Sequence, residues 1–181
     1  MNDLVVFTSL LPGPSYGYAI KKIAGLAFGY TELHSNVVYP LLRKFVERGW
    51  VQQSIKPGER GQQRKQYRLT AAGRSELMRR LAEFDDEEAG DREAFLLRVS
   101  LFGVLPPAAR QNVLAKRRAY LERRLAQLRS LEPQAQDSPF ARLVLGFGMS
   151  RMEHELAWHQ EIERLLRVKA KTKPTGKEKS R

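Results

Sequence analysis

Cysteine is absent from this chain of 181 residues. Disulfide bonds, thiolate catalysis, cysteine-ligated zinc and iron–sulfur clusters are therefore excluded. Long apolar runs are missing as well, and without ~18 consecutive apolar residues we expect no membrane-spanning helix. The N-terminal segment MNDLVVFTSLL lacks a positively charged start, and its apolar run stops at Pro12, which argues against a signal peptide. By elimination we expect a cytoplasmic protein.

The sequence also lacks the constellations that carry catalysis or bind metal. The segment HELAWH approaches a zinc-peptidase motif, but Trp158 stands where the second histidine belongs. His154 and His159 are five residues apart, about 140° around a helix, so they share no face. The third histidine, His34, is remote from both. No glycine-rich phosphate loop with a lysine is present. We therefore predict no catalytic residue, no metal and no cofactor, and we expect His154 and His159 to lie at the surface or in an interface.

Positive charge is plentiful and unevenly spread. The net charge is +12, and residues 1–84 hold 13 Lys/Arg against 6 Asp/Glu, residues 85–168 hold 13 of each, and residues 169–181 hold 6 against 1. A nucleic-acid-binding module joined to a neutral partner domain gives this asymmetry. Charge alone leaves open a basic protein that never touches nucleic acid.

The first part of the chain predicts short helices followed by a two-stranded ribbon. The apolar segment DLVVFTSLL predicts a helix closed by PGP, and Ser15 is placed to cap a second helix from residue 16 to about residue 24. A third helix opens at His34-Ser35, with Ser35 as the predicted N-cap, and stops at Gly49. Alternating segments at 50–55 and 64–70 predict two strands around a turn. Thr70 is then placed to cap a helix reaching about residue 84.

The second part predicts helices alone. The acidic run DDEEAGD at 85–91 marks the expected domain boundary, and apolar stripes predict helices over 92–105, 106–131 and 138–168. We predict three segments: a DNA-binding domain over 1–84, a helical dimerisation domain over 85–168 and a disordered basic tail over 169–181. Two long amphipathic helices cannot bury both faces as a pair, and a second copy of the chain supplies the missing surface in a symmetric homodimer.

One face of the third predicted helix carries groups suited to reading DNA. Asn36, Tyr39 and Arg43 recur at i, i+3 and i+7, with Ser35 near them, opposite the apolar stripe of Val38, Leu41, Leu42, Phe45 and Val46. Asparagine pairs bidentately with adenine and arginine with guanine, while serine and tyrosine contact phosphate or a base edge. The alternative is an ordinary solvated helix face.

The ribbon and the second helix supply further basic groups. The ribbon tip, PGERGQQRKQYR, holds Arg60, Arg64, Lys65 and Arg68. A basic hairpin suits the phosphate backbone or the minor groove, and we expect Arg64 and Lys65 to make the contact. Tyr18, Lys21 and Lys22 on the second helix are placed to contact the backbone and set the register of the protein on the duplex. The alternative here is a solubilising turn, because charged turns are usually solvated.

The order of these segments resembles the PadR family of bacterial transcriptional regulators. The matching pieces are LLPGPSYGYAIKK, VVYPLLRKFVERGWV and RKQYRLTAAGRSEL, and the helical second half, with ELAWHQEIERLL, resembles the C-terminal domain of the virulence-activator-like branch. Where the family often has His-Gly-Tyr-Glu, this chain has Tyr-Gly-Tyr-Ala at 16–19, and Gln62-Gln63 replace an Arg-Pro pair of the wing.

The resemblance implies a mainly α fold with a small β-hairpin wing: a winged helix-turn-helix followed by a C-terminal helical dimerisation domain. It also implies a homodimeric regulator, most simply a repressor, bound to a palindrome-like operator in double-stranded DNA, and a small-molecule effector in some relatives. The sequence does not set the operator, the sign of regulation or the effector. The rival hypothesis is a winged-helix adaptor that binds proteins and not specific DNA.

Overall fold

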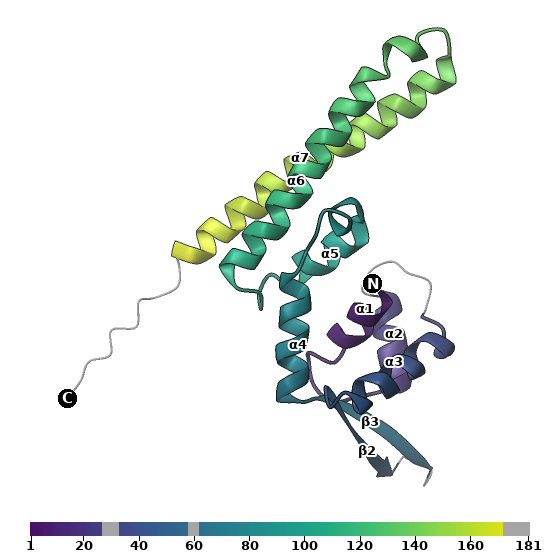
Figure 1. Ribbon diagram of the computed structural model, residues 1–181, viewed down its shortest axis with the longest axis vertical. Coiled ribbons are helices and arrows are strands. Elements are labelled where there is room, and N and C mark those ends of the chain that lie inside the picture. Colours follow the sequence, from purple (N-terminus) through teal and green to yellow (C-terminus); the bar gives the residue numbers. More distant parts are fainter. Residues whose placement is uncertain (27–32, 58–61, 172–181) are drawn as a thin grey trace, which may run out of the picture. The chain divides into compact units, whose positions relative to one another are not determined.

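The computed structural model describes residues 1–26, 33–57 and 62–171, and its contacts divide the chain into two compact units, residues 1–113 and 114–181 (Figure 1). The predicted fold class is confirmed, because short helices and a small antiparallel sheet are followed by long helices. The sequence placed the domain boundary in 85–91, whereas the contacts place it inside helix α6 (Pro107–Ser130). Of the predicted basic tail, residues 169–171 continue helix α7 and 172–181 lie outside the described residues.

The first unit opens with helices that contribute buried side chains to its core: α1 (Asn2–Thr8), α2 (Gly17–Leu26) and α3 (Ser35–Glu47). The apolar stripe predicted for α3 is real, since Val38, Leu42 and Phe45 are fully buried. The ring of Phe45 stacks on Phe7 of α1, with ring centroids 4.6 Å apart. Burying each such side chain contributes roughly 2–3 kcal/mol, so the packing of α1 fixes the orientation of α3.

The sheet has three strands where the sequence predicted two. Strands β2 (Val51–Pro57) and β3 (Gln63–Leu69) form the expected antiparallel ribbon, and the two-residue strand β1 (Ser15–Tyr16) adds to the other edge of β3 in the order β1-β3-β2. Ser15 pairs with Tyr67 in this ladder. The prediction that Ser15 caps α2 is therefore wrong, because the backbone of Ser15 is part of a strand and the helix begins only at Gly17.

The C-terminus of α3 ends as the sequence predicted. Gly49 adopts a left-handed conformation with φ of +70°, and its N–H donates to the carbonyl of Val46 while that of Trp50 donates to the carbonyl of Phe45. These two bonds form a Schellman motif, and the contact between the Trp50 and Phe45 rings completes it. The motif turns the chain from α3 directly into β2.

The start of helix α4 (Ala71–Ala82) is also as predicted. The hydroxyl of Thr70 accepts the N–H of Gly73 at 3.0 Å and lies 2.8 Å from the carbonyl oxygen of Gly49, to which it donates. One side chain thus caps α4 and holds the turn that follows α3. This contact links the position of the wing to the end of the helix before it.

An acidic segment and a short helix complete the first unit. After the 3-10 turn η1 (Glu88–Gly90), helix α5 (Arg92–Ser100) is capped by the Asp91 carboxylate. Arg98 of α5 is buried and forms an ion pair with Glu88 at 2.7 Å. Its guanidinium also donates to the carbonyls of Leu81 and Glu83, which α4 leaves without helical partners.

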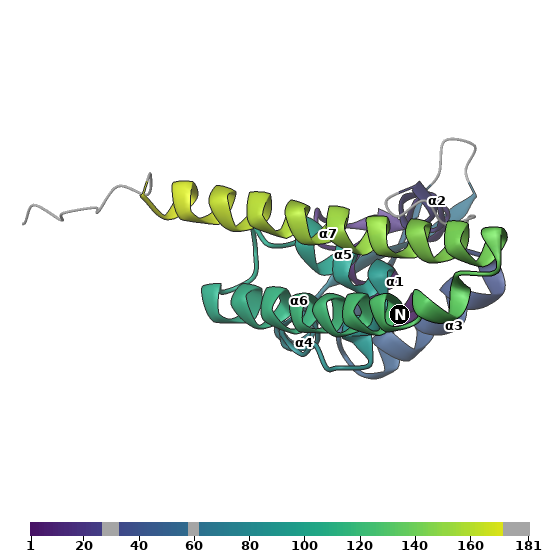
Figure 2. The same cartoon turned by 90° about the horizontal axis from the view of Figure 1, so that it is seen from above.

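Two long helices make the second unit, and Figures 1 and 2 show them side by side: the part of α6 from residue 114 and helix α7 (Pro139–Lys171). A short 3-10 turn, η2 (Pro133–Ala135), connects them. Their shared core is formed by buried and half-buried side chains, namely Tyr120, Leu121, Leu125, Leu128, Met149, Met152 and Leu156. The Ser138 hydroxyl caps α7 by accepting the N–H of Ala141.

A polar cluster is buried between these two helices. Arg117 and Glu155 form a bidentate ion pair, with nitrogen–oxygen distances of 2.7 and 3.0 Å. His159 is buried near them, with 2% of its surface exposed. The prediction of a surface or interface position is therefore wrong for His159, while His154 is exposed. Burial lowers the pKa of the His159 imidazole, partly opposed by Glu155.

The first half of α7 presents an apolar ridge outside this core. The apolar ridge consists of Phe140, Leu143, Val144 and Phe147, at i, i+3, i+4 and i+7, and each of the four side chains is at least 69% exposed. A β-carbon at Gly148 would lie 3.2 Å from Leu128, so this glycine marks a close approach of α7 to α6. Within the described ranges, no helix is both long and apolar enough to cross a membrane.

Candidate nucleic-acid interface

Helix α3 presents its predicted polar face outward. Ser35, Asn36, Tyr39 and Arg43 are all exposed, and Tyr39 retains 44% of its surface. The buried residues Val38 and Leu42 occupy the opposite face. The separation follows from the helical period, because side chains three, four and seven positions apart share a face.

Ser35 does not have the capping role that the sequence assigned to it. It is the first residue of α3, and His34 stands at the N-cap position with no capping bond from its side chain. The Ser35 hydroxyl therefore lies in the first turn of the helix, on the exposed side. This correction leaves it beside Asn36 on the same outward surface.

The wing places its two predicted cations on opposite faces of the ribbon. Arg64 pairs across the strands with Lys56, and Lys65 pairs with Ile55. Cross-strand partners share a face and successive residues alternate, so the Arg64 face also carries Lys56 and Arg68, and the Lys65 face carries one cation and the exposed Ile55. The tip of the turn, including Arg60, lies outside the described residues.

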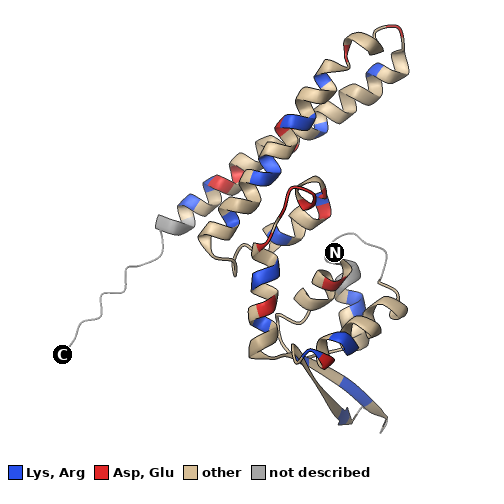
Figure 3. Cartoon of the chain, viewed as in Figure 1, with Lys and Arg blue, Asp and Glu red and all other residues tan. Residues whose placement is uncertain are grey.

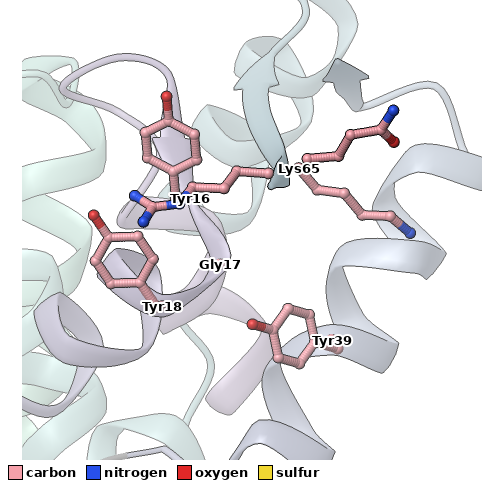
Figure 4. A pocket seen from close by; sticks show the side chains of 7 residues that line it. Tyr16, Gly17, Tyr18, Tyr39 and Lys65 are labelled. Carbon is pink, nitrogen blue, oxygen red and sulfur yellow. The ribbon is translucent and has the colours of Figure 1, made fainter. Parts of the chain in front are cut away.

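A pocket of about 620 Å³ lies between strand β1, the start of α2, helix α3 and strand β3 of the wing (Figure 4). Its lining residues are Tyr16, Gly17, Tyr18, Tyr39, Gln63, Arg64 and Lys65. The rings of Tyr16 and Tyr18 are stacked, with centroids 6.0 Å apart. Three tyrosines and two cations from four elements, β1, α2, α3 and β3, therefore line one concave surface.

The structure gathers only some of the predicted site residues in this pocket. Tyr18, Tyr39, Arg64 and Lys65 line it, while Ser35, Asn36 and Arg43 belong to the exposed face of α3 outside its lining. On α2, Lys22 is exposed and Lys21 is half-buried.

Sequence reasoning missed Tyr16, Gly17 and Gln63 as members of the pocket. The available signal was the Tyr-Gly-Tyr run, in which two aromatic side chains flank a residue without one. Its meaning required the two-residue strand β1, which is too short to show a period.

The surface around the pocket is strongly basic. In segments 15–26, 33–57 and 62–69, Glu47 is the only acidic residue, against nine basic residues: Lys21, Lys22, Arg43, Lys44, Arg48, Lys56, Arg64, Lys65 and Arg68. Figure 3 shows Lys and Arg on α2, α3 and the wing strands, and acidic residues gathered in the segment after α4. Such a surface attracts polyanions and shortens the search for them.

The chemistry of this surface is that of recognition. Among the described residues, no group of three or more histidine, aspartate or glutamate side chains is placed to hold a metal ion. Burial, and then the neighbouring Tyr39, raise the pKa of the Tyr67 phenol. Polar side chains, cations and a helix face with amide and guanidinium donors suit the edges and phosphates of a nucleic acid.

A known family model matches each half of the chain. Residues 6–79 match the model of the transcriptional regulator PadR-like family, and residues 92–167 match that of the virulence activator alpha C-terminal domain. Comparison with curated proteins gives no match.

Comparison with solved structures finds PadR proteins. A PadR family transcriptional regulator from Eggerthella lenta is 31% identical over 44% of this chain and 68% of its own, with a TM-score of 0.39. The structure of Bacillus subtilis PadR in complex with operator DNA is 19% identical over 90% of this chain and 97% of its own, with a TM-score of 0.45. From the two family models and the sequence identity to the Eggerthella regulator, this chain belongs to the PadR-like family of transcriptional regulators.

Proposed function

We propose that this regulator binds a palindrome-like operator in double-stranded DNA as a homodimer. PadR-like proteins are transcriptional regulators and not enzymes, and the observation that carries the proposal is the outward polar face of α3 beside the basic wing. Asn36 and Arg43 are exposed on that face, where bidentate contacts with adenine and guanine are available. Their base contacts would set sequence preference, and the wing cations would hold the backbone.

The proposed division of labour follows from the chemistry of each group. Lys65 carries a compact ammonium group and Arg64 a planar guanidinium, and both lie on an extended ribbon. Such cations can contact backbone phosphates whatever the base sequence. Tyr18, Lys21 and Lys22 of α2 are assigned to the same backbone role. Ser35 and Tyr39 lie between the two kinds of contact, since their hydroxyls serve phosphate or base edge equally well.

The dimer is assigned to the apolar ridge of α7. Four large apolar side chains exposed in one stripe resemble a helix face that lacks its partner. A hollow of about 500 Å³ next to it shares Phe140 and Val144 with the ridge, and its other lining residues are Ala141 and Leu145 of α7 and Leu131, Gln134 and Ala135 in and before η2. Because ridge and hollow are continuous, we assign both to the contact between subunits and not to a small-molecule effector. An isologous pairing would present two copies of α3 to one duplex.

Regulation by occupancy is the simplest consequence. A bound dimer covers its operator and excludes other proteins from that stretch of DNA, so the proposed sign is repression. The site of action is chromosomal DNA, which places the protein with the nucleoid in the cytoplasm.

Selection of genomic fragments by the purified protein tests the proposal. We expect the bound fragments to share a palindrome-like motif, and the affinity for it to fall steeply with salt because phosphate contacts release counterions. A flat salt response with no shared motif would instead favour the protein-interaction adaptor.

Substitutions then separate base reading from backbone binding. Arg43→Ala should reduce the preference for operator over random DNA by about 1–3 kcal/mol, whereas Lys65→Ala should weaken both similarly. Arg74→Ala is the matched control, since it removes one exposed cation from α4 in the same unit. Equal losses on operator and random DNA for Arg43→Ala would refute its role in reading bases.

A further inference from the structure

Gly17 lines the pocket, and because it has no side chain it leaves room for the ring of Tyr39. A β-carbon at position 17 would lie 2.6 Å from Cε1, 3.0 Å from the hydroxyl oxygen and 3.1 Å from Cζ of Tyr39. Real β-carbons essentially never approach another atom so closely, so any side chain at position 17 must displace the ring. The atoms met belong to the far end of a half-exposed side chain, which makes the displacement cheap for the fold and decisive for the position of Tyr39.

The groups around the pocket select an anion with acceptor oxygens. Arg64 and Lys65 both line it, although they lie on opposite faces of the wing, and the lining residues that the structure describes include no carboxylate. Figure 4 shows Tyr16, Tyr18, Tyr39 and Lys65 around the opening. Phenolic hydroxyls donate to phosphate oxygens, and lysine and arginine provide the counter-charge. The positive charges of Arg64 and Lys65 repel a cationic ligand and attract an anionic one.

The position of the pocket identifies the source of that anion. It lies between the wing and α3, beside the exposed face assigned to base reading. A helix in a groove brings phosphates of the flanking strand against the elements on either side of it. A phosphodiester group is compact, singly charged and presented at that place by duplex DNA, while a free phosphate has the same chemistry without the attached strand.

We propose that this pocket is a seat for one backbone phosphate of duplex DNA, and that Gly17 is its positioning residue. Gly17 touches no ligand and acts by holding the Tyr39 ring where phosphate can enter between the hydroxyl and Lys65. The proposal deepens the DNA-binding function proposed above and rests on it. It assigns a role in affinity and register, and not in base preference, to a residue that carries neither charge nor side chain.

The test measures binding to a random-sequence 30-base-pair duplex at several salt concentrations. Each phosphate contact contributes about 0.9 to the slope of log affinity against log salt. We expect Gly17→Ala to lower the slope by about that amount although it removes no charge, and to add no further loss in a Lys65→Gln background. Gly103→Ala is the matched control, because a β-carbon there has no neighbour within 4 Å, and its slope should equal that of the unaltered protein.

Two outcomes would contradict the proposed phosphate seat. One is an unchanged slope for a folded Gly17→Ala protein, and the other is a second, additive loss in the Lys65→Gln background. If Gly17→Ala fails to fold, the pair Gly17→Ala/Tyr39→Ala removes the displaced ring, and its slope should equal that of Tyr39→Ala alone. A slope for the pair that differs from the Tyr39→Ala slope also contradicts the mechanism.

Inorganic phosphate separates the two sources of the anion. At matched ionic strength, phosphate and chloride should weaken duplex binding equally, because the seat takes its anion from the strand. Stronger competition by phosphate, lost in Gly17→Ala, would assign the seat to a free anion and overturn the backbone assignment. If the unaltered protein shows no salt dependence on the duplex, the DNA-binding proposal itself fails, a result distinct from failure of the seat alone.

Discussion

Three glycines of the first unit serve three different physical needs. Gly49 supplies the left-handed conformation that ends α3. Gly17 supplies space for an aromatic ring, and Gly73 supplies space for the backbone itself. All three glycines lie in the segments that resemble the family. The same residue type therefore meets a different physical constraint at each of the three positions.

Gly73 is predicted to tolerate no side chain. A β-carbon there would overlap the carbonyl oxygen of Trp50 and lie 2.7 Å from its carbonyl carbon. Backbone cannot rotate away as a side chain does, so Gly73→Ala should lower the free energy of unfolding by about 3 kcal/mol. Urea unfolding measures it, with Gly103→Ala as the control that should change it by less than about 1 kcal/mol. Equal midpoints for the two variants would show that the loop after α3 yields easily.

Glu76 is predicted to stabilise the fold in a defined pH window. Hydrogen bonds from Arg79, then Arg80, lower its pKa from 4.5 to about 2. A carboxylate with a depressed pKa stabilises the folded state above its unfolded pKa, and this contribution is lost as pH falls from about 4.5 to 2. The difference in unfolding midpoint between the unaltered protein and Glu76→Gln should therefore be constant near neutral pH and vanish toward pH 2. A difference independent of pH would contradict the ion-pair origin of the effect.

At the scale of elements, helix ends carry most of the organisation of the first unit. The Schellman turn and the Thr70 hydroxyl fix the wing to α3 and α4, and Arg98 fixes the end of α4 to η1 and α5. Each is a polar group that satisfies backbone atoms left over by a helix terminus. The acidic segment expected to be a domain boundary is thereby held within the first unit of contacts.

Arg98 is predicted to act mainly by capping α4 and only secondarily as an ion-pair partner. Its side chain is 2% exposed, whereas that of Glu88 is 37% exposed. Arg98→Leu should cost about 3 kcal/mol because buried carbonyls lose their donors, while Glu88→Gln keeps an acceptor near solvent and should cost less than about 1 kcal/mol. Chemical unfolding of both variants checks the contrast. Similar losses would make the ion pair itself the source of stability.

What the sequence predicted at this scale depended on periodicity and on caps. The helices with apolar stripes, the alternating strands of the wing, the Gly49 stop and the Thr70 cap all followed from local patterns. Strand β1 did not, because two residues show no period and their pairing with β3 is a long-range contact. The burial of His159 was missed for a related reason, since the sequence shows that it lies on α7 but not which residues α6 places against it.

At the scale of the whole molecule, the sequence predicted which residues are exposed and which are buried better than it predicted which residues lie together in a site. The polar face of α3 follows from one helical period, so Asn36, Tyr39 and Arg43 were placed correctly as exposed. The pocket that joins Tyr16, Tyr39 and Lys65 needs three elements brought together. No local pattern encodes that meeting, and a two-residue strand creates it.

The second unit raises a question that belongs only to the assembled protein. A ridge with Phe140 80% exposed and Phe147 72% exposed would be an aggregation risk on a monomer. The bidentate pair of Arg117 and Glu155 sits in the core between α6 and α7, where a buried charge pair fixes how two helices align. When α6 and α7 are held in one alignment, the apolar ridge has a single surface shape. A symmetric dimer needs such a shape, because each subunit must fit the same surface on the other.

Phe147→Glu is predicted to convert the protein to a monomer with an intact fold. The side chain is exposed in the single subunit, so a carboxylate there disturbs no internal packing, but two copies brought together across a symmetric contact would bury like charges. Sedimentation at micromolar concentration should show the subunit mass for Phe147→Glu and twice that mass for the unaltered protein. Val104→Glu, which changes another exposed apolar side chain, is the matched control and should remain a dimer.

The loss of the dimer should then appear in DNA binding as a loss of the advantage of the second half-site. Two α3 helices held in one particle bind the second half-site at a high effective concentration, which strengthens binding by a factor of about 10²–10⁴ over one half-site alone. Phe147→Glu should therefore bind a full operator no more tightly than a single half-site, whereas Val104→Glu should retain the difference. If monomeric Phe147→Glu still discriminates between full and half operators, the subunits must associate on DNA through a surface other than the ridge of α7.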